Sequence, residues 1–353
     1  AGFGELSIAT NITINGTKTF LTSYPIVDGQ DATRVFNVQS NGTLLLQNVS
    51  LTEGFSSTDG GAIFNAGVLT LSDNVALFGN NAFGNGGAIF NQGSLVSVTN
   101  SSFTSNTADA DGNLSGNGGA IFNSTTGIIT NIDNGSTFSS NAAVNGGAIA
   151  NDGAIAAMSG NTLLQNNAAG ATSGKGGALY NNGTVATITG VTINNNTANQ
   201  GGGIYNETNA TISNSISGAT LISNNKANLG GGGIYNNGNI TAIQGVTTIT
   251  GNNADFDSNS TGDGGGFFNA AQGIITINGG THVDTNGGIH GGGIFNAGTL
   301  TMNLATASNN NAHDGGGIFN TGTISGIKSS SINNNQALAP GKLGDGGGIY
   351  NSA

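Results

Sequence analysis

The histidines are the residues of this sequence best suited to bind a metal ion. His282, His290 and His313 lie close together in the chain, and Asp284 and Asp314 are near them. Imidazole and carboxylate groups are common metal ligands. His290 and His313 both precede a glycine run in neighbouring repeats, so these two could stack. Solvated polar residues on loops look the same and are more frequent, so we predict no metal site.

Acidic residues form two groups that could supply oxygen ligands to Ca²⁺. Those of the first group each precede a Gly-Gly pair: Asp59, Asp263, Asp314 and Asp345. Those of the second group lie in longer segments between repeats: Asp109, Asp111, Asp255 and Asp257. The Gly-Gly-x-Gly-x-Asp pattern of calcium-binding repeats does not recur. We therefore expect solvated turn carboxylates and no cofactor.

The basic residues argue against catalysis on an acidic polysaccharide, which needs Asp, Lys and Arg together on one strand face. They are single and scattered: Lys18, Arg34, Lys175, Lys226, Lys328 and Lys342. With a net charge of −11 and no basic patch, nucleic-acid binding is not expected either. Apolar runs end within about six residues, far short of the ~20 that a bilayer requires, so no membrane insertion is predicted.

The elements that position these residues come from one repeated hexapeptide, Gly-Gly-Ala-Ile-Phe-Asn at 60–65. Its spacing varies from 24 residues (Asn296 to Asn320) to 33 (Asn236 to Asn269). Periods of this length indicate stacked supersecondary units. The copies end at Asn65, Asn91, Asn123, Asn151, Asn181, Asn206, Asn236, Asn269, Asn296, Asn320 and Asn351.

Two neighbouring positions of the hexapeptide predict two faces of a strand. The fourth is always large and apolar, and we place it in the core. The fifth is aromatic except at Ala150, and we place it outside because buried tyrosine hydroxyls would need partners. These aromatic residues are Phe64, Phe90, Phe122, Tyr180, Tyr205, Tyr235, Phe268, Phe295, Phe319 and Tyr350.

Each period contains two further strand signals. A link that usually ends in Gly, as at Gly67 and Gly93, suggests a left-handed turn before an alternating run such as 68–71. A third segment has an apolar residue three positions before an Asn, as in Phe103 with Asn106 or Leu163 with Asn166. Asn suits such bends because it tolerates left-handed backbone angles, and stacked Asn amides can form ladders.

Together these signals predict an all-β fold, a single-stranded right-handed parallel β-helix of about 12 coils with three short strands per coil. We expect residues 1–34 to form an N-terminal cap and 35–353 the repeat domain, whose last coil is incomplete. The pair Phe36-Asn37 matches the aromatic-Asn pair of the hexapeptide but lacks the preceding glycines, so we predict a degenerate coil over 35–54.

Four coils are longer than the others, and all four insertions are predicted at one corner of the coil. They fall at 107–117, 167–176, 253–264 and 336–346. Their charged residues are the candidate binding residues: Asp109, Asp111, Lys175, Asp255, Asp257 and Lys342.

The paired motifs resemble the repeat of the chlamydial polymorphic membrane proteins, which are autotransporter adhesins. Gly86-Gly87-Ala88-Ile89 with Phe103-Thr104-Ser105-Asn106 matches both halves, and so does Gly118-Gly119-Ala120-Ile121 with Phe138-Ser139-Ser140-Asn141. The resemblance covers roughly 60–351, although from residue 201 on the third position is mostly Gly. It implies a secreted β-helical passenger with an adhesive function.

Three functional classes follow from these observations. The first is a non-enzymatic extracellular or cell-surface β-helix that binds a surface protein or glycan of a host or neighbouring cell through the insertion corner. The absence of Cys suits an exported protein of this kind. The second is a filament formed by end-to-end self-association, because the sequence stops at Asn351-Ser352-Ala353, part-way through a coil, which would leave a strand edge unpaired. The third and least favoured is a polysaccharide-active enzyme.

Overall fold

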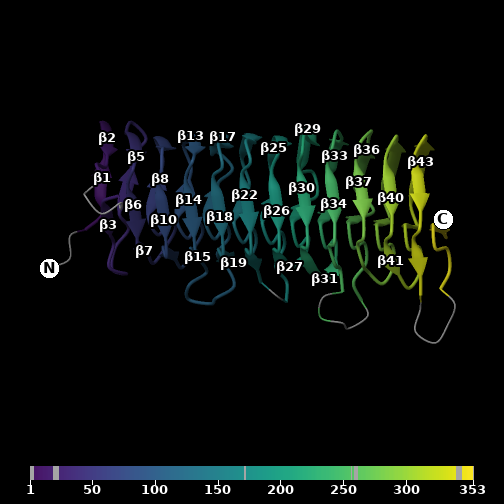
Figure 1. Cartoon of the computed structure of the whole chain (residues 1–353). Helices are drawn as coiled ribbons and strands as arrows, with labels where there is room; N and C mark the ends of the chain where they lie inside the picture. Colours follow the sequence, from purple (N-terminus) through teal and green to yellow (C-terminus); the bar gives the residue numbers. More distant parts are fainter. Residues whose placement is uncertain are drawn as a thin grey trace.

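The hexapeptides form the strands of one sheet in a column of stacked coils (Figure 1). The computed structural model describes residues 4–18, 24–170, 172–255, 257, 261–338 and 344–352. These residues contain strands and turns and no helix, which confirms the predicted parallel β-solenoid of about 12 turns. At ~4.8 Å per coil the column is on the order of 55 Å long.

The polypeptide passes through three parallel sheets in each full turn and through a fourth in most turns, and we name the sheets A to D in chain order. Sheet A has 13 strands that carry the hexapeptide positions. They are β1 (Leu6–Ile8), β4 (Phe36–Val38), β8 (Ile63–Asn65), β12 (Ile89–Asn91), β16 (Ile121–Asn123), β20 (Ile149–Asn151), β24 (Leu179–Asn181), β28 (Ile204–Asn206), β32 (Ile234–Asn236), β35 (Phe267–Asn269), β38 (Ile294–Asn296), β42 (Ile318–Asn320) and β46 (Ile349–Asn351).

Sheet B follows the link after each anchor Asn and has 12 strands. They are β2 (Asn11–Asn15), β5 (Thr43–Gln47), β9 (Val68–Ser72), β13 (Ser94–Thr99), β17 (Ile128–Asp133), β21 (Ala154–Met158), β25 (Thr184–Thr189), β29 (Thr211–Ser217), β33 (Asn239–Ile243), β36 (Ile274–Ile277), β39 (Thr299–Asn303) and β43 (Thr323–Lys328).

Sheet C also has 12 strands, each three residues long. They are β3 (Ile26–Asp28), β6 (Ser50–Thr52), β10 (Ala76–Phe78), β14 (Ser102–Thr104), β18 (Thr137–Ser139), β22 (Leu163–Gln165), β26 (Thr192–Asn194), β30 (Leu221–Ser223), β34 (Thr248–Thr250), β37 (His282–Asp284), β40 (Thr306–Ser308) and β44 (Ser331–Asn333).

Sheet D is a fourth, shorter element that the sequence did not predict. It has seven strands and a separate pair near the C-terminal end. They are β7 (Phe55–Ser56), β11 (Asn81–Ala82), β15 (Thr107–Ala108), β19 (Ala142–Ala143), β23 (Ala168–Ala169), β27 (Thr197–Gln200), β31 (Lys226–Gly230), β41 (Asn311–Ala312) and β45 (Gln336–Ala337). Most are two residues long, too short to give a periodic signal.

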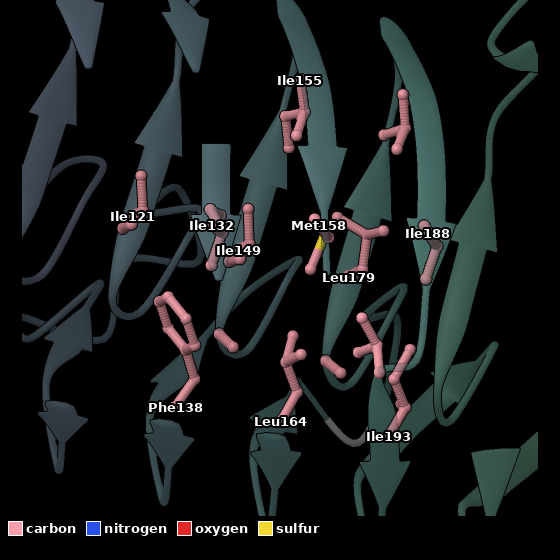
Figure 2. Packing of buried hydrophobic residues seen from close by; sticks show 14 of the residues in the cluster. Ile121, Ile132, Phe138, Ile149, Ile155, Met158, Leu164, Leu179, Ile188 and Ile193 are labelled. Carbon is pink, nitrogen blue, oxygen red and sulfur yellow. The ribbon is translucent and has the colours of Figure 1, made fainter. Parts of the chain in front are cut away.

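Equivalent residues stack in register, as predicted. Ile89, for example, pairs with Ile63 below and Ile121 above, and all three are fully buried. Figure 2 shows such columns meeting inside the coil, with Ile149 from sheet A facing Met158 from sheet B and Leu164 from sheet C. Burying each such side chain contributes about 1.5–3 kcal/mol. The apolar fourth position of the hexapeptide therefore lies in the core, as expected.

The earliest coils depart from the predicted alignment. Strands β1, β2 and β3 pair with β4, β5 and β6, so they form one more coil. Phe36 pairs with Ile63 and Asn37 with Phe64. The predicted match of Phe36-Asn37 to the aromatic-Asn pair is thus wrong by one residue, because Phe36 takes the buried core position.

Two buried asparagine ladders run the length of the column. In the first, each anchor amide donates to the next coil, as from Asn91 Nδ2 to Asn123 Oδ1 at 2.7 Å. In the second, at the junction of sheets C and D, Asn106 Nδ2 donates to Asn141 Oδ1 at 2.9 Å. The backbone N–H of Asn106 donates to the same oxygen. Each amide thus satisfies buried groups of two coils, which stabilises the bends.

Two details of these bends differ from the prediction. Asn167, not Asn166, is the ladder residue of its coil: Asn167 is fully buried, whereas Asn166 precedes it with φ 55°. The left-handed angle therefore falls on the residue before the ladder Asn. The link glycines, for their part, are not left-handed. A Cβ on Gly93 would lie 2.2 Å from the carbonyl oxygen of Gly67, so they are needed for close contact between coils.

The glycine pair of the hexapeptide has two distinct tasks. Gly118, the first of its pair, has φ +68°, a left-handed angle that Gly adopts without strain. Gly119, the second, has no room for a side chain, because a Cβ would lie 2.2 Å from the carbonyl oxygen of Gly147 on the next coil. This explains why both positions are Gly in every hexapeptide.

Candidate binding surfaces

The insertions leave the column along one edge, between sheets D and A (Figure 1). One lies between β15 and β16, another between β23 and β24, a third between β34 and β35, and the fourth between β45 and β46. The predicted common corner is confirmed for the described parts of these segments. We call it the loop-bearing edge.

A polar groove of about 290 Å³ opens on this edge between the third and fourth insertions. In neighbouring coils the residue directly after the ladder Asn carries a side chain, as in Asn253 and Asn311, but here it is Gly287. A Cβ on Gly287 would meet no atom closer than 3.9 Å, so the missing side chain leaves a hollow. Its walls include Asp255, His313 and Leu338. Sheet D is interrupted at this place, where isolated bridges at 253 and 287 replace its strands.

The acidic candidate residues differ in what their side chains do. Asp109 Oδ1 accepts hydrogen bonds from the backbone N–H of Leu114 and of Ser115, so it closes its own loop. Asp111 and Asp257 are exposed. Asp255 lines the groove. Their participation in binding stays a prediction.

The two basic candidate residues, Lys175 and Lys342, are not found beside the acidic candidates in the described part of the insertions. Lys175 Nζ is 2.6 Å from Glu207 Oε2 and lies over the ring of Tyr205. It therefore belongs to the aromatic face of sheet A rather than to a loop tip. Lys342 lies outside the described residues.

The aromatic residues form two runs of stacked rings on the outer face of sheet A. Phe64, Phe90 and Phe122 make the first run, with centroids 5.1 and 5.4 Å apart. The second run continues from Tyr180 to Tyr350, with spacings from 4.6 to 5.9 Å. Because each ring covers the faces of its neighbours, the stack presents ring edges to solvent, except at Phe122 and Tyr205, which are buried.

The tyrosines at the start of the second run lie around one partly buried ion pair. Glu207 accepts hydrogen bonds from Lys175 and from the Tyr180 hydroxyl. Desolvation opposes ionisation of Glu207, but the hydrogen bonds from Lys175, Thr208 and Tyr180 and the Lys175 charge together outweigh it and lower the pKa of that carboxyl. Burial, reinforced by the Glu207 charge, raises the pKa of both Tyr180 and Tyr205. Burial also raises the pKa of Tyr235 to about 12, so these phenols stay neutral.

Comparison with known proteins identifies the repeat. The family model of the Chlamydia polymorphic membrane protein repeat matches residues 100–124, 190–207 and 329–352. These three segments are similar to Chlamydia polymorphic membrane protein repeats. No curated protein and no solved structure matches the chain.

The two halves of the polymorphic membrane protein repeat have separate places in the coil. In the segment 100–124, Phe103 fills the core under sheet C and Asn106 enters the second ladder. Gly118 and Gly119 then lead into the sheet A strand that ends at Asn123. The repeat is therefore a scaffold sequence, and its outward-facing positions are available for binding.

The three histidines of the chain occupy different surroundings. His282 Nδ1 lies 2.8 Å from Thr306 Oγ1, and His313 lines the groove on the loop-bearing edge. His290 Nδ1 is 2.8 Å from Asp263 Oδ1 and its Nε2 is 3.8 Å from Asp314 Oδ2. The hydrogen bond to Asp263 is the main cause that raises the pKa of His290, against desolvation that lowers it. His290 pairs in register with Asp314, so the predicted stack with His313 is wrong by one residue.

The described part of the chain brings no three His, Asp or Glu side chains together as metal ligands. Within the same residues there is no helix long and apolar enough to span a membrane. Sequence reasoning missed the groove at Gly287 and Gly288, although one signal was present: Gly287 stands where the neighbouring coils carry Asn253 and Asn311.

Proposed function

We propose that this chain is a non-enzymatic, surface-exposed β-solenoid of adhesin type that binds a protein or glycan of a neighbouring cell through its loop-bearing edge. The polymorphic membrane protein repeats and the solenoid fold fit a surface protein of this type. The observation that carries the finer proposal is that the insertions leave from one edge and flank a groove there. Variable loops on a regular scaffold are where solenoids usually place their partners.

Shortening the loops tests this proposal directly. Residues 109–116 can be replaced by Phe-Gly, the pair that joins Ala82 to Asn85 in a short coil. Residues 170–174 can be replaced by one Asn, as between Ala198 and Gln200. Far-UV circular dichroism should stay unchanged, and binding of the fluorescently labelled chain to cultured animal cells should fall at least tenfold in flow cytometry.

A matched control uses the opposite side of the coil. Thr276→Ala changes an outward side chain of sheet B, far from the loops, and should bind cells as the parent does. If the loop-shortened chain binds equally well, the first two insertions are not the binding surface. If the parent chain binds no cell line, the adhesive function is wrong.

End-to-end association of copies is the second candidate, favoured by apolar surface at the first coil. Leu6 and Ile26 are 54% and 63% exposed. They lie by an apolar groove of about 280 Å³ that reaches Ile14 and Phe36. Sedimentation velocity over a range of concentrations should show chains longer than one copy, and Ile26→Glu should abolish them. A single monomeric species at all concentrations would exclude this assembly.

A further inference from the structure

A second polar groove runs along the corner between sheets B and C, at the other end of the sheet C strands from the loop-bearing edge (Figure 1). One part, about 330 Å³, extends from Tyr24 to Thr137. The other, about 470 Å³, includes Asp73 and Asn161. Both parts include Asn100 and Gly135, so they form one continuous depression across several coils.

The floor of the groove is built from small side chains in register. Ser50, Ala76, Ser102 and Thr137 begin four successive strands of sheet C and point outward one above the other. Leu163 takes this position on the next strand and ends the run of small residues. Tyr24 stands at the other end. The groove therefore has a definite length of about four coils.

A column of amides runs along the corner, and two of them, Asn74 and Asn100, line the groove. Asn48, Asn74 and Asn100 turn the chain at this corner with left-handed angles, and Asn74 Nδ2 donates to Asn48 Oδ1 at 3.1 Å. Asn100 Nδ2 donates in the same way to Asn74 Oδ1 at 3.3 Å. An amide has two N–H groups and an oxygen with two lone pairs. Each amide in the column thus retains hydrogen-bonding capacity toward the groove.

An exposed aromatic ring stands beside the floor. Phe78 is 51% exposed and follows Ala76 by two residues, so both point outward from the same strand. Its neighbours in register are Thr52 and Thr104. The corresponding residues of later strands are also polar, for example Asn194. Phe78 thus interrupts a polar column on the strand whose Ala76 forms part of the groove floor.

We propose that this groove binds a neutral oligosaccharide along the axis of the column. Sugar hydroxyls pair with amides and hydroxyls, and the apolar face of a pyranose packs on an aromatic ring. The ~4.8 Å coil spacing is close to the length of one pyranose unit, so successive sugars meet successive amides. Asp73 is the charged residue among those lining the groove, and the chain carries a net charge of −11. Acidic sugars are therefore disfavoured.

Titration calorimetry with cellotetraose, chitotetraose, maltotetraose and the acidic tetragalacturonate tests this proposal. We expect at least one neutral tetrasaccharide to bind and the acidic one not to bind. Phe78→Ser, which copies the chemistry of the neighbouring strands, and Asn100→Gly, which keeps the left-handed angle, should each raise the Kd at least tenfold. Far-UV circular dichroism of both variants should match that of the parent.

The matched control is Asn194→Ser, in the same column of sheet C but away from the groove, and it should leave the Kd unchanged. The loop-shortened chain described above should also bind the sugar normally, which separates this site from the loop-bearing edge. The proposal fails if no neutral tetrasaccharide gives a saturable signal. It also fails if both groove variants bind as the parent does, or if tetragalacturonate binds more tightly.

Discussion

Replacing one ladder asparagine should destabilise the column far more than its size suggests. In Asn141→Ala, the Asn141 amide no longer donates to Asn167 Oδ1 or to the Phe103 carbonyl. The backbone and side-chain N–H groups of Asn106 lose the oxygen that accepts them both. At about 1 kcal/mol per hydrogen bond, plus the cost of buried donors left without a partner, the loss is about 4–5 kcal/mol.

Two measurements check this magnitude. The urea midpoint followed by far-UV circular dichroism should fall by about 1 M or more for a loss of this size. Because repeat arrays can open locally, hydrogen exchange of peptides from β14, β18 and β22 should accelerate by about 10³. The matched control is Asn182→Ala, whose exposed amide donates to Asp152 and whose loss should cost under ~0.5 kcal/mol. Equal effects of the two substitutions would refute the claim that the ladder holds the coils together.

Three further outcomes follow from packing and charge. Phe138→Ala, which empties a fully buried site, should lower the free energy of unfolding by about 3–5 kcal/mol. Phe90→Ala, in the half-exposed stack, should lower it by less than half of this amount. Equal urea midpoints for the two variants would contradict this difference. Gly119→Ala should prevent folding or lower the thermal midpoint sharply, because its Cβ would lie 2.2 Å from the carbonyl oxygen of Gly147. Gly112→Ala has open space around its Cβ, so it should lower the free energy of unfolding by only ~1 kcal/mol, because of the left-handed backbone angle at this residue. Folding raises the pKa of His290. Protonated His290 therefore stabilises the folded chain fully below its unfolded pKa of 6.5, and this contribution is lost as the pH rises through the folded pKa. Thermal midpoints should show the parent losing stability relative to His290→Gln across that pH range, and parallel pH profiles would exclude the effect.

Particular residues show where sequence reasoning stopped. Asn166 and Asn167 are adjacent and identical, and a repeat of variable length does not say which one stacks. Gly93 was predicted as a turn glycine, but Gly is required there because a side chain would clash with a carbonyl oxygen of another coil. Lys175 lies in an insertion by sequence, but its side chain meets Glu207, which is 32 residues away.

The sequence alone determined the solenoid, because like residues at a steady period can be buried together only when successive coils stack. It also determined the inward Ile, the outward aromatic residues and the common corner of the insertions, since alternation and spacing are properties of the chain itself. The fourth sheet, the groove at Gly288 and the amide-lined corner depended on the tertiary structure. Each of these arises from contacts between coils, where the exact register of neighbours decides whether a side chain fills a space, leaves it open or lines it.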